Sequence, residues 1–332
     1  MPNLYVTELG SVVEKEAEQL LVTKGSEVRP AVPARRIEQV VLVGPVGVTT
    51  PALDFLLDRG IGLVLLTARG EFRGRLAGDL SRHVALRHRQ HQRADDAAFG
   101  LGIGRAIVAG KIHNSRTLCL RWDETNDDPT TLAATRELRT LEEGAGRAPG
   151  IATLMGIEGR AARLYFGELG RRLRAPWCFT NRARRPPPDP VNALLSICYT
   201  LLHESCYAAL EAAGLDPFCG FLHQPRYGRA SLALDLMEEF RPLIADLVVM
   251  RLANLRRLAP GDFQPEPGPR VRLSRDGWRV VAEEYNRRLQ TLVGVPGARR
   301  RTTYQRLLEV QARHLRHAIE GAAPTYEPFR AR

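Results

Sequence analysis

An α+β fold is predicted, with a small β-sheet domain over residues 1–85 and a larger, mostly α-helical domain over residues 86–332. Short runs of β-branched residues fill the first 80 residues, and Gly, Pro or charge clusters bound them. Beyond about residue 90, apolar residues recur at spacings of three and four, which is typical of amphipathic helices. The 332 residues, 44% of them hydrophobic, allow a sizeable core in one large domain or two ordinary ones.

The expected strands of the first domain lie at residues 4–7, 20–23, 39–43 and 62–67. A short helix is expected over residues 49–57, because Thr49 is a suitable N-cap and Pro51 fits a first helical turn. A basic, histidine-rich connector is expected to begin near Ser81.

In the second domain, long helices are expected over residues 193–213, 232–255 and 304–319. The Pro-rich segment 182–190 must be extended, because proline disfavours helix at itself and at the residue before it. Ser231 is a candidate N-cap for the helix that begins there, and Pro242 should kink the same helix.

The charge of the chain points to a polyanionic partner. The net charge of +11 favours nucleic acid first and an anionic membrane surface second. No apolar run approaches the ~20 residues of a membrane-spanning helix, and the N-terminus lacks a signal-peptide pattern, so no membrane association is expected. The five cysteines form no CxxC pair, which argues against a disulfide framework or a zinc finger and for a reducing cytoplasm.

Two carboxylates and one imidazole are the candidate metal ligands and catalytic residues: Glu158, His223 and Glu238. Such a mixed oxygen and nitrogen set suits Mg²⁺ or Mn²⁺ better than a structural zinc. A carboxylate-rich metal site in a basic protein suggests phosphodiester chemistry on nucleic acid. Asp235 lies three residues before Glu238 and so shares its helix face, whereas Glu239 is rotated by about 100°.

Each of these residues also has a purely structural interpretation. The acidic residues Asp235, Glu238 and Glu239 could form a solvated helix face. Glu158 could be a helix N-terminal carboxylate that interacts with the dipole. His223 follows Phe221 and Leu222, so it could be a hydrogen-bonded core histidine.

Basic segments at 82–93, 171–174, 182–185 and 299–301 suit contact with a DNA backbone, where Lys and Arg position the duplex without reading its sequence. Arg182, Arg184 and Arg185 are the favoured DNA-contacting residues, because their Pro-rich loop follows Glu158 closely. For any one arginine, a solvated charged face is the alternative interpretation.

Other suggestive motifs are set aside. The histidine pairs 88/91 and 314/317 offer too few ligands for zinc and are expected on helix surfaces. Residues 100–111 resemble a phosphate-binding loop, but the spacing is wrong and Ile112 replaces the required Ser or Thr. Tight helix packing or a turn explains these glycines better.

Taken together, the order and spacing of several stretches resemble one family, the CRISPR-associated spacer-acquisition integrases, which are the metal-dependent DNase subunit of the CRISPR adaptation complex. The similarity runs nearly end to end, over residues 47–53, 60–64, 70–76, 111–114, 155–159, 185–195, 220–223, 231–243 and 326–332. Two departures, Gln224 where an acidic residue is common and Gln305 where arginine is usual, remove no ligand.

The resemblance implies that Glu158, His223 and Glu238 bind Mg²⁺ or Mn²⁺. Asp235 matches an acidic position that lies near the metal in some members, as a support for a ligand or as an alternative ligand. Lys111 and Asn114 fall on family positions without an assigned role.

The family also implies an activity and partners. The enzyme would insert short foreign DNA fragments into the CRISPR array by attack of a 3′-hydroxyl on the repeat, so its substrates would be double-stranded protospacer and repeat DNA. It would form an asymmetric homodimer, with dimer and partner contacts on the N-terminal domain. The dimer would assemble with a small ferredoxin-like adaptation subunit as a heterohexamer.

Two alternatives remain open from the sequence. A structure-selective nuclease acting on branched DNA in repair would use the same metal site. A non-catalytic DNA-binding scaffold would use only the basic surface, and the intact set of Glu158, His223 and Glu238 argues against it.

Overall fold

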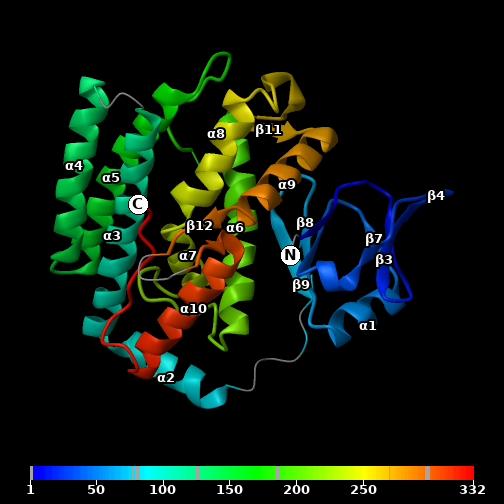
Figure 1. The fold of residues 1–332 in the computed structure, drawn as a ribbon, viewed down its shortest axis with the longest axis horizontal. Helices are drawn as coiled ribbons and strands as arrows, with labels where there is room; N and C mark the ends of the chain where they lie inside the picture. The colour runs from blue at the N-terminus through cyan, green and yellow to red at the C-terminus, as the bar shows by residue number, and fades with distance from the viewer. Residues whose placement is uncertain are drawn as a thin grey trace.

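The computed structural model describes residues 3–76, 78, 83–123, 127–183, 187–268, 270–295 and 300–332. As predicted, a strand-rich N-terminal part precedes a mostly helical remainder (Figure 1). Arg184 and Arg185, two of the expected DNA-contacting residues, lie outside the described residues, as do Arg82 and Arg299 of the basic segments.

The N-terminal part contains two sheets. The first has the order β1-β6-β8-β9, with β1, β6 and β8 parallel and β9 antiparallel, and the second has the order β4-β3-β2-β7, with β5 also paired to β3. The strands are β1 (Leu4–Val6), β2 (Val12–Glu16), β3 (Gln19–Lys24), β4 (Glu27–Val28), β5 (Val32–Pro33), β6 (Gln39–Val43), β7 (Gly47–Val48), β8 (Gly62–Leu66) and β9 (Phe72–Leu76). All four predicted strands are present.

The short helix α1 (Thr50–Asp58) is also present, with Thr49 at its N-cap and proline in its first turn. The side chain of Thr49 makes no capping hydrogen bond. Instead, its carbonyl oxygen accepts hydrogen bonds from the backbone N–H groups of Ala52 and Leu53, both at 3.0 Å.

Strand β6 links the two parts of the molecule. Its Val40 and Leu42 belong to a core enclosed by the N-terminal sheets and α1, whereas Val41 and Val43 belong to the main core with the helices. Successive side chains of a strand point to opposite faces, so β6 contributes to both cores. This strand is buried throughout.

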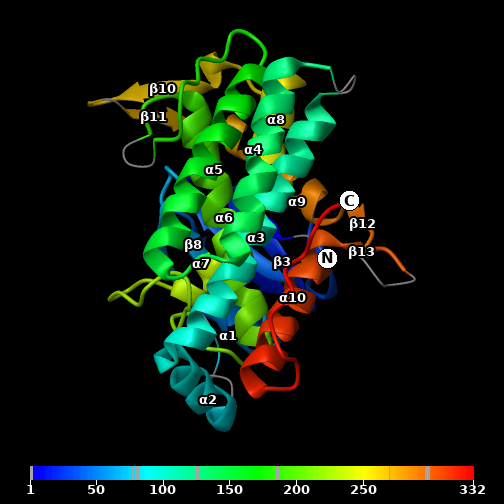
Figure 2. The ribbon, with the colours of Figure 1, turned by 90° about the vertical axis from the view of Figure 1, so that its left-hand side faces the viewer.

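The helical part is built around α6, which Figure 1 shows running through the centre of the molecule. Helices α3, α4 and α5 pack against each other on one side of the molecule, which lies at the left in Figure 1 and faces the viewer in Figure 2. The helices are α2 (Val84–Asp95), α3 (Ala97–Trp122), α4 (Pro129–Gly146), α5 (Ile151–Arg172), α6 (Pro190–Ala212), α7 (Ser231–Glu238), α8 (Leu247–Asn254), α9 (Arg275–Leu289) and α10 (Tyr304–Glu320).

Smaller elements complete this part. They are a π-helical turn (Arg241–Asp246), a 3₁₀ turn at Pro260–Asp262, and two hairpins, β10 (Phe263–Glu266) with β11 (Arg270–Leu273) and β12 (Leu292–Val293) with β13 (Thr302–Thr303). A further 3₁₀ turn, Ala34–Arg36, lies in the N-terminal part. The expectation that no apolar stretch is long enough to cross a membrane is wrong for helix α6, which is long and apolar enough to do so. However, 72% of its apolar window is buried inside the protein, as in a core helix.

Helix α6 starts where the Pro-rich segment ends. Pro190 is in its first turn, and the side chain of the N-cap Asp189 accepts a hydrogen bond from the backbone N–H of Asn192 at 2.8 Å. The described parts of the preceding segment, at 182–183 and 187–189, are non-helical, as predicted.

The structure corrects three local predictions. The segment expected to be a connector forms helix α2 from Val84, which packs on α3 and α10. The helix expected over residues 232–255 is divided into α7, the π-helical turn that contains Pro242, and α8. Proline cannot donate a backbone hydrogen bond, so the helix changes form there instead of merely bending.

The third correction concerns Ser231, which does not cap α7. The N-cap is Ala230, and the Ser231 hydroxyl donates instead to the carbonyl oxygen of Gln224 at 3.3 Å. Gly220 packs closely against Ser231, where an added Cβ would lie 2.7 Å from Ser231.

The motifs set aside behave as expected. The histidine pairs lie exposed on α2 and α10. Gly104 lies within α3, where an added Cβ would meet Leu154 at 3.2 Å and Leu222 at 3.4 Å.

Candidate active site

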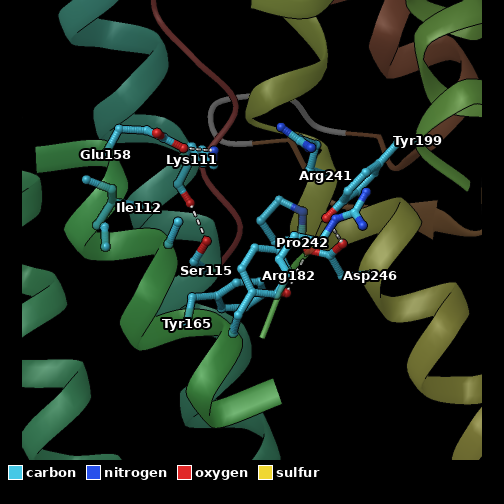
Figure 3. Close-up of a pocket in the computed structure, with 13 residues that line it drawn as sticks. Lys111, Ile112, Ser115, Glu158, Tyr165, Arg182, Tyr199, Arg241, Pro242 and Asp246 are labelled. Carbon is cyan, nitrogen blue, oxygen red and sulfur yellow. Dashed lines mark hydrogen bonds and ion pairs between the residues drawn. The ribbon is translucent and has the colours of Figure 1, made fainter. Parts of the chain in front are cut away.

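Glu158 and Lys111 face each other from two packed helices. Glu158 lies in the interior of α5, past the first turn, so the interpretation as a helix-terminal carboxylate is wrong. Lys111 lies on α3, and its ammonium forms an ion pair with Glu158 Oε1 (Figure 3). The ammonium also lies 2.6 Å from Glu238 Oε2. Two carboxylates that are 80 positions apart in sequence therefore converge on one Nζ atom.

Glu238 ends α7, immediately before the π-helical turn. Its Oε1 accepts a 2.6 Å hydrogen bond from Arg241 Nη1. Its Oε2 is buried beside Lys111 but accepts no hydrogen bond of suitable direction from any residue the structure describes. Burial alone would raise the pKa of Glu238, but the charges of Arg241, Lys111 and His223 outweigh it and lower the pKa well below its ordinary value. The carboxylate is therefore held ionised inside the protein.

Asp235 fixes the position of His223. Its Oδ1 lies 2.7 Å from His223 Nδ1 and accepts the backbone N–H of His223 at 2.9 Å. Its Oδ2 accepts the N–H groups of Phe221 and Leu222 at 2.6 and 3.0 Å. These four interactions occupy both carboxylate oxygens, which favours a supporting role for Asp235 over that of an alternative ligand. They also leave His223 Nε2 as the nitrogen available to another group.

The acidic residues of α7 do not form a solvated face, because Asp235, Glu238 and Glu239 are all buried. Glu239 points to the other side of the helix, where it accepts hydrogen bonds from the Tyr326 hydroxyl at 2.7 Å and the backbone N–H of Phe329 at 2.8 Å. Burial raises the pKa of Glu239 to about 8 despite these hydrogen bonds. Sequential carboxylates thus have separate roles, one in the candidate site and one in anchoring the C-terminal segment.

Asn114 anchors the same C-terminal segment. Its Nδ2 donates to the carbonyl oxygens of Glu239 and Phe329, and its Oδ1 accepts the N–H of Ala331, each at 2.8 Å. The neighbouring His113 lies 3.1 Å from Glu142 Oε1 and 3.0 Å from the Ala331 carbonyl oxygen. Both residues therefore have structural partners.

A cavity of about 40 Å³ adjoins Lys111 and Glu158 (Figure 3). In its wall, Tyr165 and Tyr199 donate hydrogen bonds to Asp246 at 2.9 and 2.6 Å. Burial raises the pKa of Asp246 to about 6, although both tyrosines favour its ionised form. Arg241 stacks on the ring of Tyr199 at 4.0 Å, so the aromatic wall and the support of Glu238 are connected.

Arg182 lines the same cavity and is tied to α6. Its guanidinium donates to Asn192 Oδ1 at 2.8 Å and to Ser196 Oγ at 3.1 Å. These bonds give Arg182 a structural role, and its contact with DNA stays a prediction.

The donor set fits a hard divalent cation. The described residues form no ready cluster of three or more His, Cys, Asp and Glu ligands, and the Lys111 ammonium lies between the two carboxylates. However, the two carboxylates already accommodate a cation, the Lys111 ammonium. Glu238 Oε2 accepts no directed hydrogen bond from the described residues. His223 is oriented through Nδ1, which leaves its Nε2 available. Carboxylate oxygens and imidazole nitrogen are suitable ligands for Mg²⁺ or Mn²⁺.

Three contributors to this site were not identified from the sequence. Lys111 was only a position without a role, and Arg241 and Asp246 were not singled out. The sequence could have indicated that Arg241 pairs with Glu238, because it lies three residues after Glu238 in a segment expected to be helical. No sequence pattern indicated Asp246, because its partners Tyr165 and Tyr199 are distant in sequence.

Known proteins resemble this chain over nearly its whole length. The family model described as CRISPR associated protein Cas1 matches residues 4–287. The CRISPR-associated endonuclease Cas1 1 of Moorella thermoacetica is 37% identical over 333 residues, which span 98% of this chain and 97% of the relative.

Solved structures agree with this similarity. A Cas1 protein from Thermotoga maritima has the same fold, with a TM-score of 0.82 over 97% of each chain at 22% identity. A Cas6-RT-Cas1–Cas2 complex matches 99% of this chain with a TM-score of 0.81 at 25% identity, although this chain covers only 36% of that one. The match over most of the sequence, together with the shared fold, establishes that the chain belongs to the Cas1 family of CRISPR-associated proteins.

Proposed function

We propose that this chain is the metal-dependent DNA endonuclease and integrase of CRISPR adaptation, with Glu158, His223 and Glu238 as its metal ligands. Membership of the Cas1 family supports the enzyme class, since its relatives are named endonucleases. The observation that carries the site assignment is the convergence of Glu158 and Glu238 on one partly buried cationic position. His223 is oriented by Asp235 Oδ1, which lies 2.7 Å from its Nδ1, so its Nε2 stays available as a ligand atom.

The reaction is a transesterification. The 3′-hydroxyl oxygen of a short DNA duplex forms a bond to phosphorus in the repeat, the bond to the 3′-oxygen of the target strand breaks, and that strand leaves with a 3′-hydroxyl. One phosphodiester replaces another, so the step needs no ATP and no covalent enzyme intermediate. A bound Mg²⁺ or Mn²⁺ would polarise the attacked phosphoryl group and stabilise the charge that develops on its oxygens.

Neighbouring residues hold the candidate metal ligands in position. Asp235 keeps His223 in one orientation, and Arg241 holds one oxygen of Glu238, so both candidate ligands are positioned before substrate arrives. Neutral imidazole adds a ligand without adding negative charge that would repel DNA.

The net charge of +11 supports double-stranded protospacer and repeat DNA as substrates. The match to a Cas6-RT-Cas1–Cas2 complex supports assembly with a second adaptation subunit, which we propose to be the small ferredoxin-like one. We further propose a homodimer within a heterohexamer, with the N-terminal domain (residues 1–85) making dimer and partner contacts and residues 86–332 forming the catalytic domain. The cysteines, none of which forms a disulfide, are consistent with a cytoplasmic location.

The decisive experiment uses a branched DNA that mimics a half-integrated spacer, in the reverse of integration. The protein is incubated with this DNA in Mg²⁺ or Mn²⁺, and in parallel with EDTA. We expect the target strand to be rejoined only with the divalent ion. A repair nuclease would cut the branch without rejoining it. DNA binding that is indifferent to EDTA, with no cleavage or rejoining even when the adaptation partner is added, would support the scaffold alternative.

The DNA-contact prediction is tested by salt dependence. Because each neutralised phosphate changes the slope of log binding constant against log salt by about 0.9, replacing Arg182, Arg184 and Arg185 with alanine should flatten the slope by up to about 3. The control replaces two exposed arginines of the N-terminal domain, Arg35 and Arg36. If both variants give the same slope as the wild type, the Pro-rich loop does not contact the backbone.

A further inference from the structure

Lysine is rare in this chain, and one of the few lysines is at the candidate site. Lys15, Lys24 and Lys111 are the only lysines, so 45 of the 48 basic residues are arginine. Lys111 is largely buried, with 13% of its side chain exposed. A lysine ammonium is a compact charge on a flexible stem, whereas a guanidinium is a rigid fork that binds carboxylates through two hydrogen bonds. A lysine side chain is therefore better suited than an arginine side chain to carry a positive charge that changes position.

The charges that are directly paired with Glu158 and Glu238 balance without a metal ion. Glu158 and Glu238 contribute two negative charges, and Lys111 and Arg241 contribute two positive charges. A divalent ion bound by the same carboxylates would place two further positive charges beside the ammonium. The lysine and the ion therefore compete for the same oxygens.

Of the two basic residues, Lys111 is the one free to leave. Arg241 is held by Glu238 and stacks on Tyr199, within the π-helical turn. Among the described residues, the Lys111 ammonium donates to no acceptor beyond the two carboxylates. It also borders the cavity next to Glu158, which gives the side chain space to turn (Figure 3).

We infer that Lys111 is an exchangeable cation, which neutralises Glu158 and Glu238 in the metal-free protein and transfers to a DNA phosphate when a divalent ion takes its place. This inference rests on the proposed metal site. Lys111 is thus a positioning residue that couples ion binding to DNA binding. Such coupling is reciprocal, so DNA must strengthen ion binding by the factor by which the ion strengthens DNA binding.

The test measures binding and needs no turnover. Mn²⁺ is titrated by calorimetry into the wild type and Lys111→Met, with and without a DNA duplex that ends in dideoxynucleotides. Methionine keeps the bulk of the stem and removes the charge. Lys24→Met is the matched control, because it removes the same charge from a surface pair with Glu8.

Without DNA, Lys111→Met should bind Mn²⁺ about tenfold more tightly than the wild type, within the usual range for coupled sites. Addition of DNA should tighten Mn²⁺ binding in the wild type and in Lys24→Met more than in Lys111→Met. Equal or weaker Mn²⁺ binding by Lys111→Met would overturn the inference. Absence of Mn²⁺ binding by the wild type would instead refute the metal site itself.

A second measurement uses only the wild type, so it stands even if Lys111→Met does not fold. With three lysines, acetylation by a water-soluble reagent is readily assigned by peptide mass spectrometry. Lys111 should be protected in EDTA and become several-fold more reactive when Mn²⁺ is added, and added DNA should protect it again. The reactivity of Lys24 provides the internal standard. Reactivity of Lys111 that does not respond to Mn²⁺ would show that the lysine stays in place.

Discussion

Glu158→Gln should abolish metal-dependent cleavage and strand transfer while leaving the protein folded. The substitution keeps the shape of the side chain and removes the charge that a divalent ion needs. Loss of a group that stabilises developing charge costs about 10²- to 10³-fold in rate, and loss of the ion itself would cost more. Glu158 is the better choice than the more buried Glu238, whose replacement would also leave Arg241 unpaired inside the protein.

The measurement is strand transfer on the branched DNA at saturating Mn²⁺, combined with a thermal unfolding curve. The matched control is Glu142→Gln, another partly buried glutamate that faces His113 rather than the candidate site. We expect the control to retain near wild-type rates. Undiminished strand transfer by Glu158→Gln would remove this residue from the reaction.

The second large effect is expected on stability, from Asn114→Ala. Three buried partners would lose a hydrogen bond, namely the carbonyl oxygens of Glu239 and Phe329 and the N–H of Ala331. Each buried group left without a partner costs about 1–3 kcal/mol, so the loss of three should lower the free energy of unfolding by about 3–9 kcal/mol. The C-terminal segment should also detach from α3 and become sensitive to protease.

Urea denaturation and limited proteolysis check this expectation. His113→Ala is the control, because His113 contacts the same segment through one carbonyl oxygen and is only partly buried. It should cost about 2 kcal/mol, because it removes two partly exposed hydrogen bonds, one to Ala331 and one to Glu142, at about 1 kcal/mol each. If the two variants were equally stable, the Asn114 interactions would not be what holds the segment.

Much of the fold could be predicted because local patterns determine it. The bounds predicted from the β-branched runs at 39–43 and 62–67 and from the apolar spacing at 193–213 and 304–319 lie within three residues of the observed elements. Strand β2 (Val12–Glu16) was not predicted, since its charged residues Glu14, Lys15 and Glu16 conceal the alternation. The division of 232–255 was anticipated only as a kink, because the π-helical form depends on the packing around Pro242.

The site was predictable only in part. Residue types and the family resemblance indicated Glu158, His223 and Glu238, and the i, i+3 spacing placed Asp235 on the same helix face as Glu238. That Asp235 contacts His223 depends on how the loop before α7 folds back onto that helix. That Lys111 lies between two glutamates depends on how α3, α5 and α7 pack. Contacts between residues 47 or more positions apart are set by tertiary structure, which a single sequence does not reveal.

The shared strand β6 has a consequence for how the chain can be divided. Alternate residues of this strand belong to two cores, so neither core can lose it without exposing apolar surface in both. The change from strands to helices near residue 85 is therefore not a boundary at which the protein can be cut. A fragment that begins at residue 86 would leave uncovered the helical surface that Val41, Val43, Val64 and Leu66 normally bury. Such a fragment should aggregate, whereas the whole chain should unfold as one cooperative unit.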